Sequence, residues 1–420
     1  MRRLRTAPTR RLTVFLGALV ALVLTATIAQ AALTGSGPTP SPKALANAIL
    51  DAFDAPEPDG LSAKIHFTNR LLPSGSLPNG AASPLAAGAD GRLWIQGSGR
   101  FRLELQSDAG DTQIVSDGDR VTVYDASSNT VYRATLPEQA EDAAQPRRHA
   151  SEKLTLAKIQ RTLDRLAKTW TVSGAEPTSI AGRPAYTVKI SPKDDGGLLG
   201  AAQVAWDSVR GAPLRAAVYA RGRSEPVLEL AATDVSYDAV PDSAVVVAPP
   251  KGAKVNDLTA DEGSGPGHGA GTGTGTGALG AYEDRATHAK RAKPQSLAAV
   301  QRALGFDVAA PATLAGLPRR AVRLVTLDGE RGALAIYGKG LGAIGVLQHK
   351  AGTAKPAPAP TRRHGDRSLR LPQVDIEGAP GTELATALGT VVTFSQDGVA
   401  YVVAGAVPPV VAENAARDLR

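Results

Sequence analysis

The side chains that most often hold metal ions or transfer protons are scattered along this chain and form no motif. No two of its six histidines have the spacing of a metal site, and neither H-E-x-x-H nor G-x-S-x-G occurs. The adjacent acids Asp194 and Asp195 stand in a Lys-Asp-Asp-Gly-Gly segment, which is typical of a tight turn. The sequence therefore predicts a protein that is not an enzyme and uses no metal and no cofactor. A hydrolase with an unassigned serine or aspartate is kept as an alternative. The histidines are His66, His149, His268, His288, His349 and His364.

One glycine pattern matches a nucleotide-binding fingerprint in form. Gly340, Gly342 and Gly345 follow an expected strand at 333–337 with the spacing G-x-G-x-x-G. That fingerprint needs a helix directly afterwards, whose N-terminus receives the pyrophosphate, and an acidic residue about 20 residues further on. A short apolar segment and a Pro-Ala stretch at 356–360 follow instead. The pattern indicates a glycine-rich hairpin.

The net charge of the chain does not indicate a nucleic-acid partner. The formal charge is +7, but five of the cations are arginines within residues 1–11, and 42 basic against 40 acidic residues remain. Nucleic-acid binding requires basic residues that cluster on one face. The pairs Arg147-Arg148 and Arg362-Arg363 are short and lack interleaved aromatic residues, so we expect solvated loops there.

The N-terminal residues carry an export signal. The arginine-rich residues 1–11 precede an apolar run at 12–33, which ends in the small-x-small sequence Ala29-Gln30-Ala31. Residues 1–33 are therefore a signal peptide or a retained membrane anchor. The 22-residue apolar run is also long enough to span a bilayer, which takes about 20 residues. The chain has no cysteine, so it carries no lipid anchor on a cysteine and no disulfide.

Short strands with alternating apolar and polar residues dominate the central part of the chain. Residues 101–105 alternate in this way, and Asp117-Gly118 and Ser128-Asn129 are turn signals on either side of Val121–Tyr124. This alternation predicts an antiparallel sheet with one dry and one wet face. A helix is expected after Ser41 as N-cap, and a second between Ser151 and Trp170.

Composition predicts two domains. Residues 263–280 are a Gly/Thr stretch that cannot bury a core, so we place a flexible linker at 256–293. The first domain then spans 34–255. The second, at 294–420, reads as a small α+β domain that opens with a helix after 294 and closes with one after Pro408-Pro409.

Several motifs in the first domain resemble a known superfamily. Residues 115–133 resemble the strand hairpin of LolA-type lipoprotein carriers, with Thr122-Val123 where an aromatic residue often stands, and residues 181–188 resemble a strand entry of RseB-type proteins. Residues 401–409 before a final helix resemble the C-terminal domain of RseB-type sigma-factor regulators. The resemblance implies a mainly β (α+β) fold: a curved antiparallel half-barrel closed by helices over an apolar concavity, plus a small C-terminal α+β domain. It carries over no catalytic residue.

The dry face of the sheet allows two interpretations. Either the helices cover it and close a core, or a gap between helices and sheet stays apolar and admits a ligand. A shift of one residue in any strand would invert the assignment of its faces. The residues placed on the concave face are Ile65, Phe67, Leu93, Ile95, Phe101, Leu103, Leu105, Val121, Val123, Val188, Ile190, Val204, Trp206 and Val218.

These observations together predict an exported, non-catalytic binding protein on the extracytoplasmic side of the cytoplasmic membrane. Its expected ligand is a lipid or the acyl chains of a lipoprotein. The alternative is an RseB-like sensor whose partner is the outer domain of an anti-sigma factor or another single-pass membrane protein.

Overall fold

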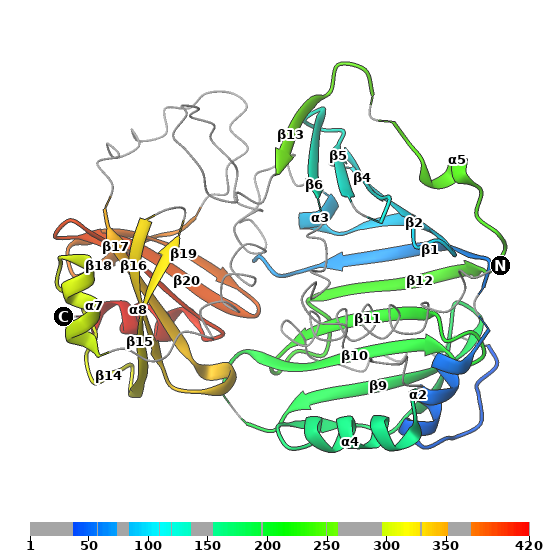
Figure 1. The fold of residues 1–420 in the computed structure, drawn as a ribbon, viewed down its shortest axis with the longest axis horizontal. Coiled ribbons are helices and arrows are strands. Elements are labelled where there is room, and N and C mark those ends of the chain that lie inside the picture. Colours follow the sequence, from blue (N-terminus) through cyan, green and yellow to red (C-terminus); the bar gives the residue numbers. More distant parts are fainter. Residues whose placement is uncertain are drawn as a thin grey trace, which may run out of the picture. The chain divides into compact units, whose positions relative to one another are not determined.

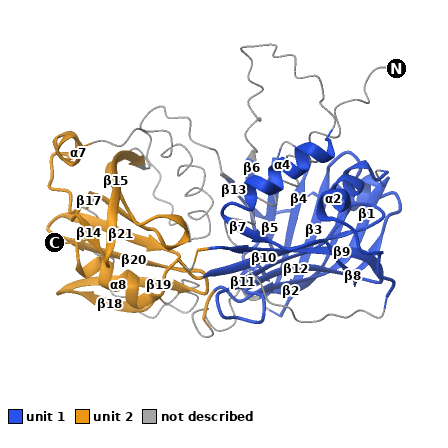
Figure 2. Cartoon of the chain, turned by 90° about the horizontal axis from the view of Figure 1, so that it is seen from below, with its two compact units in different colours: residues 1–71, 80–193, 199–260 blue, residues 72–79, 194–198, 261–420 orange. Residues whose placement is uncertain are grey.

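The computed structural model describes residues 37–56, 58–73, 84–108, 110–118, 120–135, 154–194, 196–248, 250–258, 296–327, 330–351 and 371–419. The expected signal peptide or anchor at 1–33, and nearly all of the expected linker at 256–293, lie outside the described residues. Within the described part, no helix is both long enough and apolar enough to cross a membrane. The chain divides into two compact units (Figure 2). The first comprises residues 1–71, 80–193 and 199–260, and the second residues 72–79, 194–198 and 261–420.

The first unit is built on one sheet that curls into a half-barrel (Figure 1), which confirms the expected fold class. Its strands run in the order β13-β6-β5-β4-β3-β2-β1-β12-β11-β10-β9-β7, with β8 also paired to β9. Neighbouring strands are antiparallel except β13 and β6, which are parallel. The strands are β1 (Gly60–Asn69), β2 (Ala89–Gln96), β3 (Phe101–Ser107), β4 (Gly110–Ser116), β5 (Arg120–Asp125), β6 (Thr130–Thr135), β7 (Trp170–Val172), β8 (Glu176–Ile180), β9 (Arg183–Pro192), β10 (Leu199–Asp207), β11 (Pro213–Ala220), β12 (Leu228–Ser236) and β13 (Lys254–Leu258).

Tight turns set the register of the β4–β5 and β5–β6 hairpins, as the turn residues predicted. Gly118 and Asn129 adopt positive φ angles of 103° and 47°, a region that glycine and asparagine enter most readily. The carboxylate of Asp125 accepts hydrogen bonds from the hydroxyls of Ser127 and Ser128, which braces the second turn.

The two helices that the sequence predicted in the first unit, α2 (Leu45–Asp54) and α4 (Leu156–Leu166), begin later than expected. Two short helices, α3 (Pro84–Ala87) and α5 (Asp242–Val245), were not predicted. Ala44, not Ser41, occupies the N-cap of α2, because Lys43 pairs with Ala175 in an extended bridge. Thr155 occupies the N-cap of α4, Ser151 lies outside the described residues, and Trp170 begins β7 instead of ending the helix.

The second unit has an eight-stranded antiparallel sheet in the order β14-β15-β16-β17-β21-β20-β19-β18. Its strands are β14 (Thr313–Leu314), β15 (Leu317–Leu327), β16 (Glu330–Tyr337), β17 (Ile344–Lys350), β18 (Gln373–Ile376), β19 (Ala379–Thr386), β20 (Gly389–Gln396) and β21 (Val399–Gly405). Two helices, α7 (Leu297–Leu304) and α8 (Pro409–Arg417), pack on this sheet and share one core, in which Val300, Val346 and Ala412 are buried.

The glycine pattern at 340–345 forms a hairpin connection, as predicted. Gly340–Gly342 make a single 3-10 turn, and strand β17 follows where a nucleotide site would need a helix.

Candidate ligand-binding face

The apolar side chains of the first unit's sheet share one side, here called the apolar face. Residues that pair directly on neighbouring strands project to the same side of a sheet. Across β2 to β5, Leu93 pairs with Leu103, Leu103 with Ile114, and Ile114 with Val123. The adjacent row of pairs runs from Ile95 through Phe101 and Ser116 to Val121.

The same face continues across β1 into the other half of the sheet. Phe67 of β1 pairs with Leu230 of β12, and that row continues through Ala216 and Val204 to Val188 of β9. Ile190, Val218 and Trp206 lie in neighbouring rows of paired residues and project to the same face. The pairing register therefore places all fourteen candidate residues on this one face, although β-bulges interrupt the β1–β12 and β10–β11 pairs.

Helices cover the half of the apolar face that β9 and β10 form. The phenol of Tyr186 donates a hydrogen bond of 2.6 Å to the carbonyl of Ser41, just before α2, and Tyr186 pairs with Trp206 on this face. Figure 2 shows α2 and α4 together on one side of the sheet. Trp206 and Ile190 are buried, with exposed fractions of 4% and 3%. Val188, Ile190 and Trp206 thus form a covered core in this half, and Val204 on β10 is half-buried.

The half of the face on β2 to β5 is covered less. The short helix α3 contacts β1, β3 and β4 at one end, where Leu105 is fully buried. Towards the other end, the apolar side chains stay half-buried: Leu93, Ile95, Phe101, Leu103, Val121 and Val123. Of the two interpretations drawn from the sequence, a covered core describes β9 and β10, and a partly open apolar surface describes β2 to β5.

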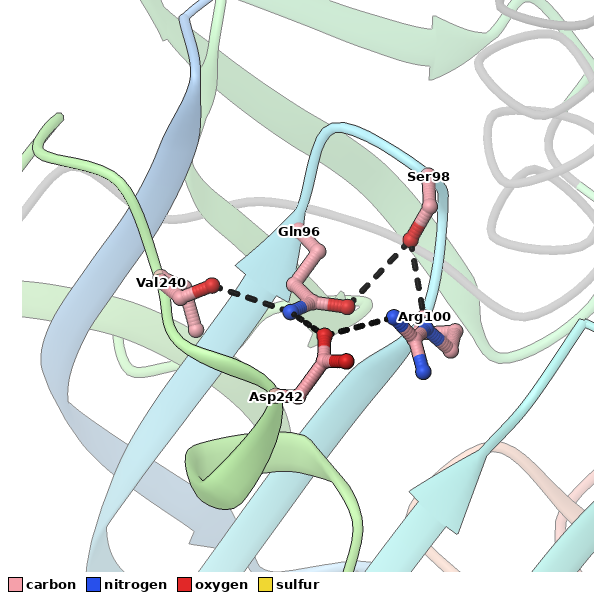
Figure 3. A network of polar contacts seen from close by, with 5 residues as sticks. All are labelled: Gln96, Ser98, Arg100, Val240 and Asp242. Atoms are coloured by element: carbon pink, nitrogen blue, oxygen red, sulfur yellow. Dashed lines mark hydrogen bonds and ion pairs between the residues drawn. The ribbon is translucent and has the colours of Figure 1, made fainter.

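Helix α5 packs on the opposite face of these strands. The amide of Gln96 donates hydrogen bonds to the carbonyl of Val240 (2.9 Å) and to the carboxylate of Asp242 (2.8 Å), which also accepts one from Arg100 at 2.7 Å (Figure 3). The hydrogen bond from Gln96 and the charge of Arg100 lower the pKa of Asp242. Arg102 donates to the carbonyl of Ala244 from the same side of the sheet. These contacts fix α5 away from the apolar face.

Two buried polar atoms lie on the apolar face without a hydrogen-bond partner in the described part of the chain. They are Oγ1 of Thr112 on β4 and Nε1 of Trp206 on β10. A hydroxyl and an indole N–H can each donate one hydrogen bond, and leaving such a group unpaired costs about 1–3 kcal/mol. Both could donate to a carbonyl or carboxylate oxygen that reached them.

The sequence-based list missed several half-buried residues of this face, among them Ile114, Tyr132 and Leu230. Ile114, Tyr132 and Leu230 pair with Leu103, Val123 and Phe67 respectively. Ile114 and Val115 are adjacent apolar residues, so the sequence there does not show which side chains point to which face of the strand. The turn at Asp117-Gly118 held the missing signal, because it pairs Ser116 with Val121 and thereby Ile114 with Val123.

The acidic and histidine side chains form no metal-binding cluster within the residues described. No cluster of three or more histidine, aspartate or glutamate side chains there could hold a metal ion. Asp194 is exposed, and Asp195 lies outside the described residues. On the apolar face of β2 to β5 the half-buried side chains are apolar ones such as Leu93, Leu103 and Val123.

Comparison with known proteins finds one matching family model and several similar solved structures. A family described as "Predicted periplasmic protein (DUF2092)" matches residues 80–158. A structure of the Pseudomonas aeruginosa MucA/MucB complex matches with 15% identity and a TM-score of 0.38, covering 88% of this chain and 95% of that one. The chain is similar to MucB. No curated protein matches it significantly.

Two further solved structures match about half of the chain. A LolA superfamily protein from Nitrosomonas europaea matches with 13% identity and a TM-score of 0.20, covering 49% of this chain and 98% of that one. An uncharacterized conserved protein from Thermus thermophilus matches with 10% identity and a TM-score of 0.30, covering 51% and 96%. The families that the sequence motifs resembled are thus among the solved structures that match this chain.

Proposed function

We propose that this chain is an extracytoplasmic, non-catalytic protein whose first unit binds acyl chains, either free lipid or those of a lipoprotein, on the apolar face. The observation that carries the proposal is the row of half-buried apolar side chains on β2 to β5, centred on Leu103. Contiguous apolar surface that a fold leaves partly uncovered commonly marks a binding site.

The polar atoms on the face support an acyl ligand in particular. An ester or carboxyl group at the end of an acyl chain offers hydrogen-bond acceptors and a long apolar body. Of the two polar atoms, Oγ1 of Thr112 lies on β4, in the half of the face that carries the half-buried row, and supplies a donor there. A ligand of this class would gain from apolar burial at about 0.8 kcal/mol per buried CH₂.

Ligand content is the direct test. The full chain is purified from its own membranes and weighed by native mass spectrometry, and the delipidated protein is then titrated with a fluorescent fatty acid. We expect a bound mass in the range of acylated molecules and saturable uptake of the fluorescent probe. A clean mass for the chain alone, together with no uptake, would rule the proposal out.

A pair of substitutions on one strand tests the location of the site. Leu103→Glu places a charge on the apolar face, whereas Gln106→Glu places the same side chain on the opposite face of β3. We expect Leu103→Glu to weaken uptake at least about tenfold, which corresponds to about 1.4 kcal/mol, and Gln106→Glu to leave it unchanged. Val123→Thr keeps the shape and replaces one methyl group of the apolar face by a hydroxyl, so it covers the case in which Leu103→Glu does not fold. Equal uptake by all variants would place the ligand elsewhere.

The second candidate function is a regulator that binds the outer domain of an anti-sigma factor. It is favoured by the second unit, which has its own sheet and core in addition to the ligand-binding unit. A pull-down from membranes separates the two functions. Recovery of one single-pass membrane protein supports the regulator, and recovery of lipoproteins supports the carrier.

A further inference from the structure

Helix α4 carries a stripe of basic residues along one side. Lys158, Arg161 and Arg165 are spaced three and four residues apart, so they lie on one side of the helix, and Lys168 follows in the turn that ends it. Arg161, Arg165 and Lys168 are exposed, and Lys158 is half-buried. The opposite side of α4 faces the protein with apolar side chains: Ile159, Leu163 and Leu166.

The stripe is a local excess of positive charge. Between residues 156 and 168 the single acid is Asp164, which accepts a hydrogen bond from Gln160 at 3.3 Å. A fifth cation joins the stripe at the end of the helix, where the ammonium of Lys193 donates to the carbonyl of Ala167. Beyond residues 1–11, the whole chain has 42 basic and 40 acidic residues, so the stripe does not reflect a generally basic protein.

Acidic residues of the neighbouring helix do not cancel this charge. Helix α2 packs against α4 and contributes two acids, Asp51 and Asp54. Asp51 forms an ion pair with Lys43. Together the two helices and their flanking lysines remain cationic.

The composition of the stripe fits a membrane surface better than a protein partner. Protein interfaces are organised around buried aromatic or apolar anchors. The exposed positions beside the cations carry small or polar side chains instead: Ala157, Gln160, Thr162 and Asp164. The exposed apolar side chain of α4, Leu156, stands at the first helical position and not within the row of cations. A straight row of cations over about 15 Å of helix matches a plane of anionic headgroups, which attracts lysine and arginine through its surface potential.

We propose that the outer side of α4 docks the first unit on the surface of an anionic lipid bilayer. The attraction is mainly electrostatic, because Ile159 on the apolar side of α4 is buried, Leu163 and Leu166 are half-buried, and Leu156 at the start of the helix is the exposed exception. This docking does not depend on a ligand on the apolar face, so it can be tested and fail independently of the proposed function.

The absence of cysteine from the chain makes a site-specific test direct. Thr162→Cys, exposed beside the stripe, receives a fluorescent label in the full chain, and Ser224→Cys, exposed in the β11–β12 turn, serves as the reference position. The labelled chains are mixed with vesicles of phosphatidylcholine, with or without phosphatidylglycerol, that contain a headgroup-linked quencher. Because an apolar segment such as 12–33 would bind either vesicle, the readout is quenching at each position and not total binding.

We expect quenching at position 162 with anionic vesicles alone, its loss at high salt, and little quenching at position 224. Arg161→Glu with Arg165→Glu should reduce quenching at 162 to the level seen with neutral vesicles. Arg223→Glu with Lys251→Glu changes the net charge equally at exposed sites away from α4, and should have no effect. Arg161→Gln with Arg165→Gln, which preserves helix propensity, should also weaken the quenching. Equal quenching with neutral vesicles, or quenching that survives the α4 substitutions, would overturn the proposal.

Discussion

The guanidinium Nε of Arg215 lies 2.5 Å from a carboxylate oxygen of Glu229, and both side chains are almost completely buried, with exposed fractions of 11% and 12%. The pair bridges β11 and β12 on the face opposite the apolar face. The same guanidinium also donates to the side-chain oxygen of Gln203 and to the hydroxyl of Tyr219. Every charged group of the cluster thus has a partner, which is the condition under which a buried ion pair is tolerated.

Removing only one of the two charges in this cluster should destabilise the first unit strongly. Arg215→Met leaves the carboxylate of Glu229 buried and unpaired, so we expect a loss of about 3–5 kcal/mol in the free energy of unfolding. Arg215→Met with Glu229→Leu removes both charges and should recover most of that loss. Urea unfolding followed by tryptophan fluorescence measures it, since Trp94, Trp170 and Trp206 all belong to the first unit. If Arg215→Met were as stable as the wild type, the Arg215–Glu229 pair would contribute nothing to the free energy of unfolding.

The cluster also marks a limit of prediction from sequence. Alternation assigned fourteen residues to a concave face, and the strand register puts all fourteen on one side of the sheet, because period two fixes relative side-chain direction within a strand. The same rule implied a wet opposite face, which holds for Lys64 and His66 but fails at Gln203, where that face is buried. Burial depends on what packs over a strand, and such long-range contacts leave no period in the sequence.

Helix boundaries were missed for a related reason. Ser41 and Ser151 had the chemistry of N-caps, but the first helix starts after Ala44 because the residues before it pair with the segment at Ala175. Which half of the apolar face the helices would cover was equally unpredictable, since it follows from the docking of α2 and α4 and not from the strands.

The phenol of Tyr186 should contribute measurably to holding the segment before α2 in place. Tyr186→Phe removes its hydrogen bond to the carbonyl of Ser41 but keeps the tilted ring contact with Trp206 at 6.2 Å. We expect a loss of about 0.5–1.5 kcal/mol in the stability of the first unit. Hydrogen exchange should rise in residues 41–48 more than in β9. Unchanged exchange in that segment would contradict this role.

In the second unit, Glu383 should make the attachment of α8 sensitive to pH. Burial, followed by the nearby charge of Glu413 on α8 and a hydrogen bond with it, raises the pKa of Glu383. Glu413 in turn lies 2.6 Å from Arg417. In the unfolded chain Glu383 ionises near 4.5, whereas in the folded unit it keeps its proton to higher pH. Its contribution to stability is therefore complete below about pH 4.5 and is lost as the pH rises through the raised pKa.

Glu383→Gln keeps a neutral side chain at every pH and should remove this dependence. We expect α8 in the variant to be better protected than in the wild type at pH 8, and equally protected near pH 4. Amide hydrogen exchange of Ala412, Ala415 and Ala416, corrected for intrinsic rates, reports this directly. Asp307→Asn, a neutralised acid at an exposed position of the same unit, is the control. A parallel pH profile for wild type and Glu383→Gln would contradict the assignment.

Alanine substitutions at Gly211 and Gly222 distinguish the energetic cost of backbone strain from that of a steric clash. Both have positive φ, 67° and 71°, and both lie in turns of the first unit's sheet. A Cβ at Gly222 would meet nothing within 4 Å, whereas at Gly211 it would come within 2.1 Å of the carbonyl oxygen of Ala52 in α2. Gly222→Ala should therefore cost about 1 kcal/mol from conformation alone. Gly211→Ala should cost about 1–3 kcal/mol more, because α2 must shift away from the turn. Tryptophan-monitored urea unfolding of the two variants measures the difference, and equal losses would mean that α2 is not held against this turn.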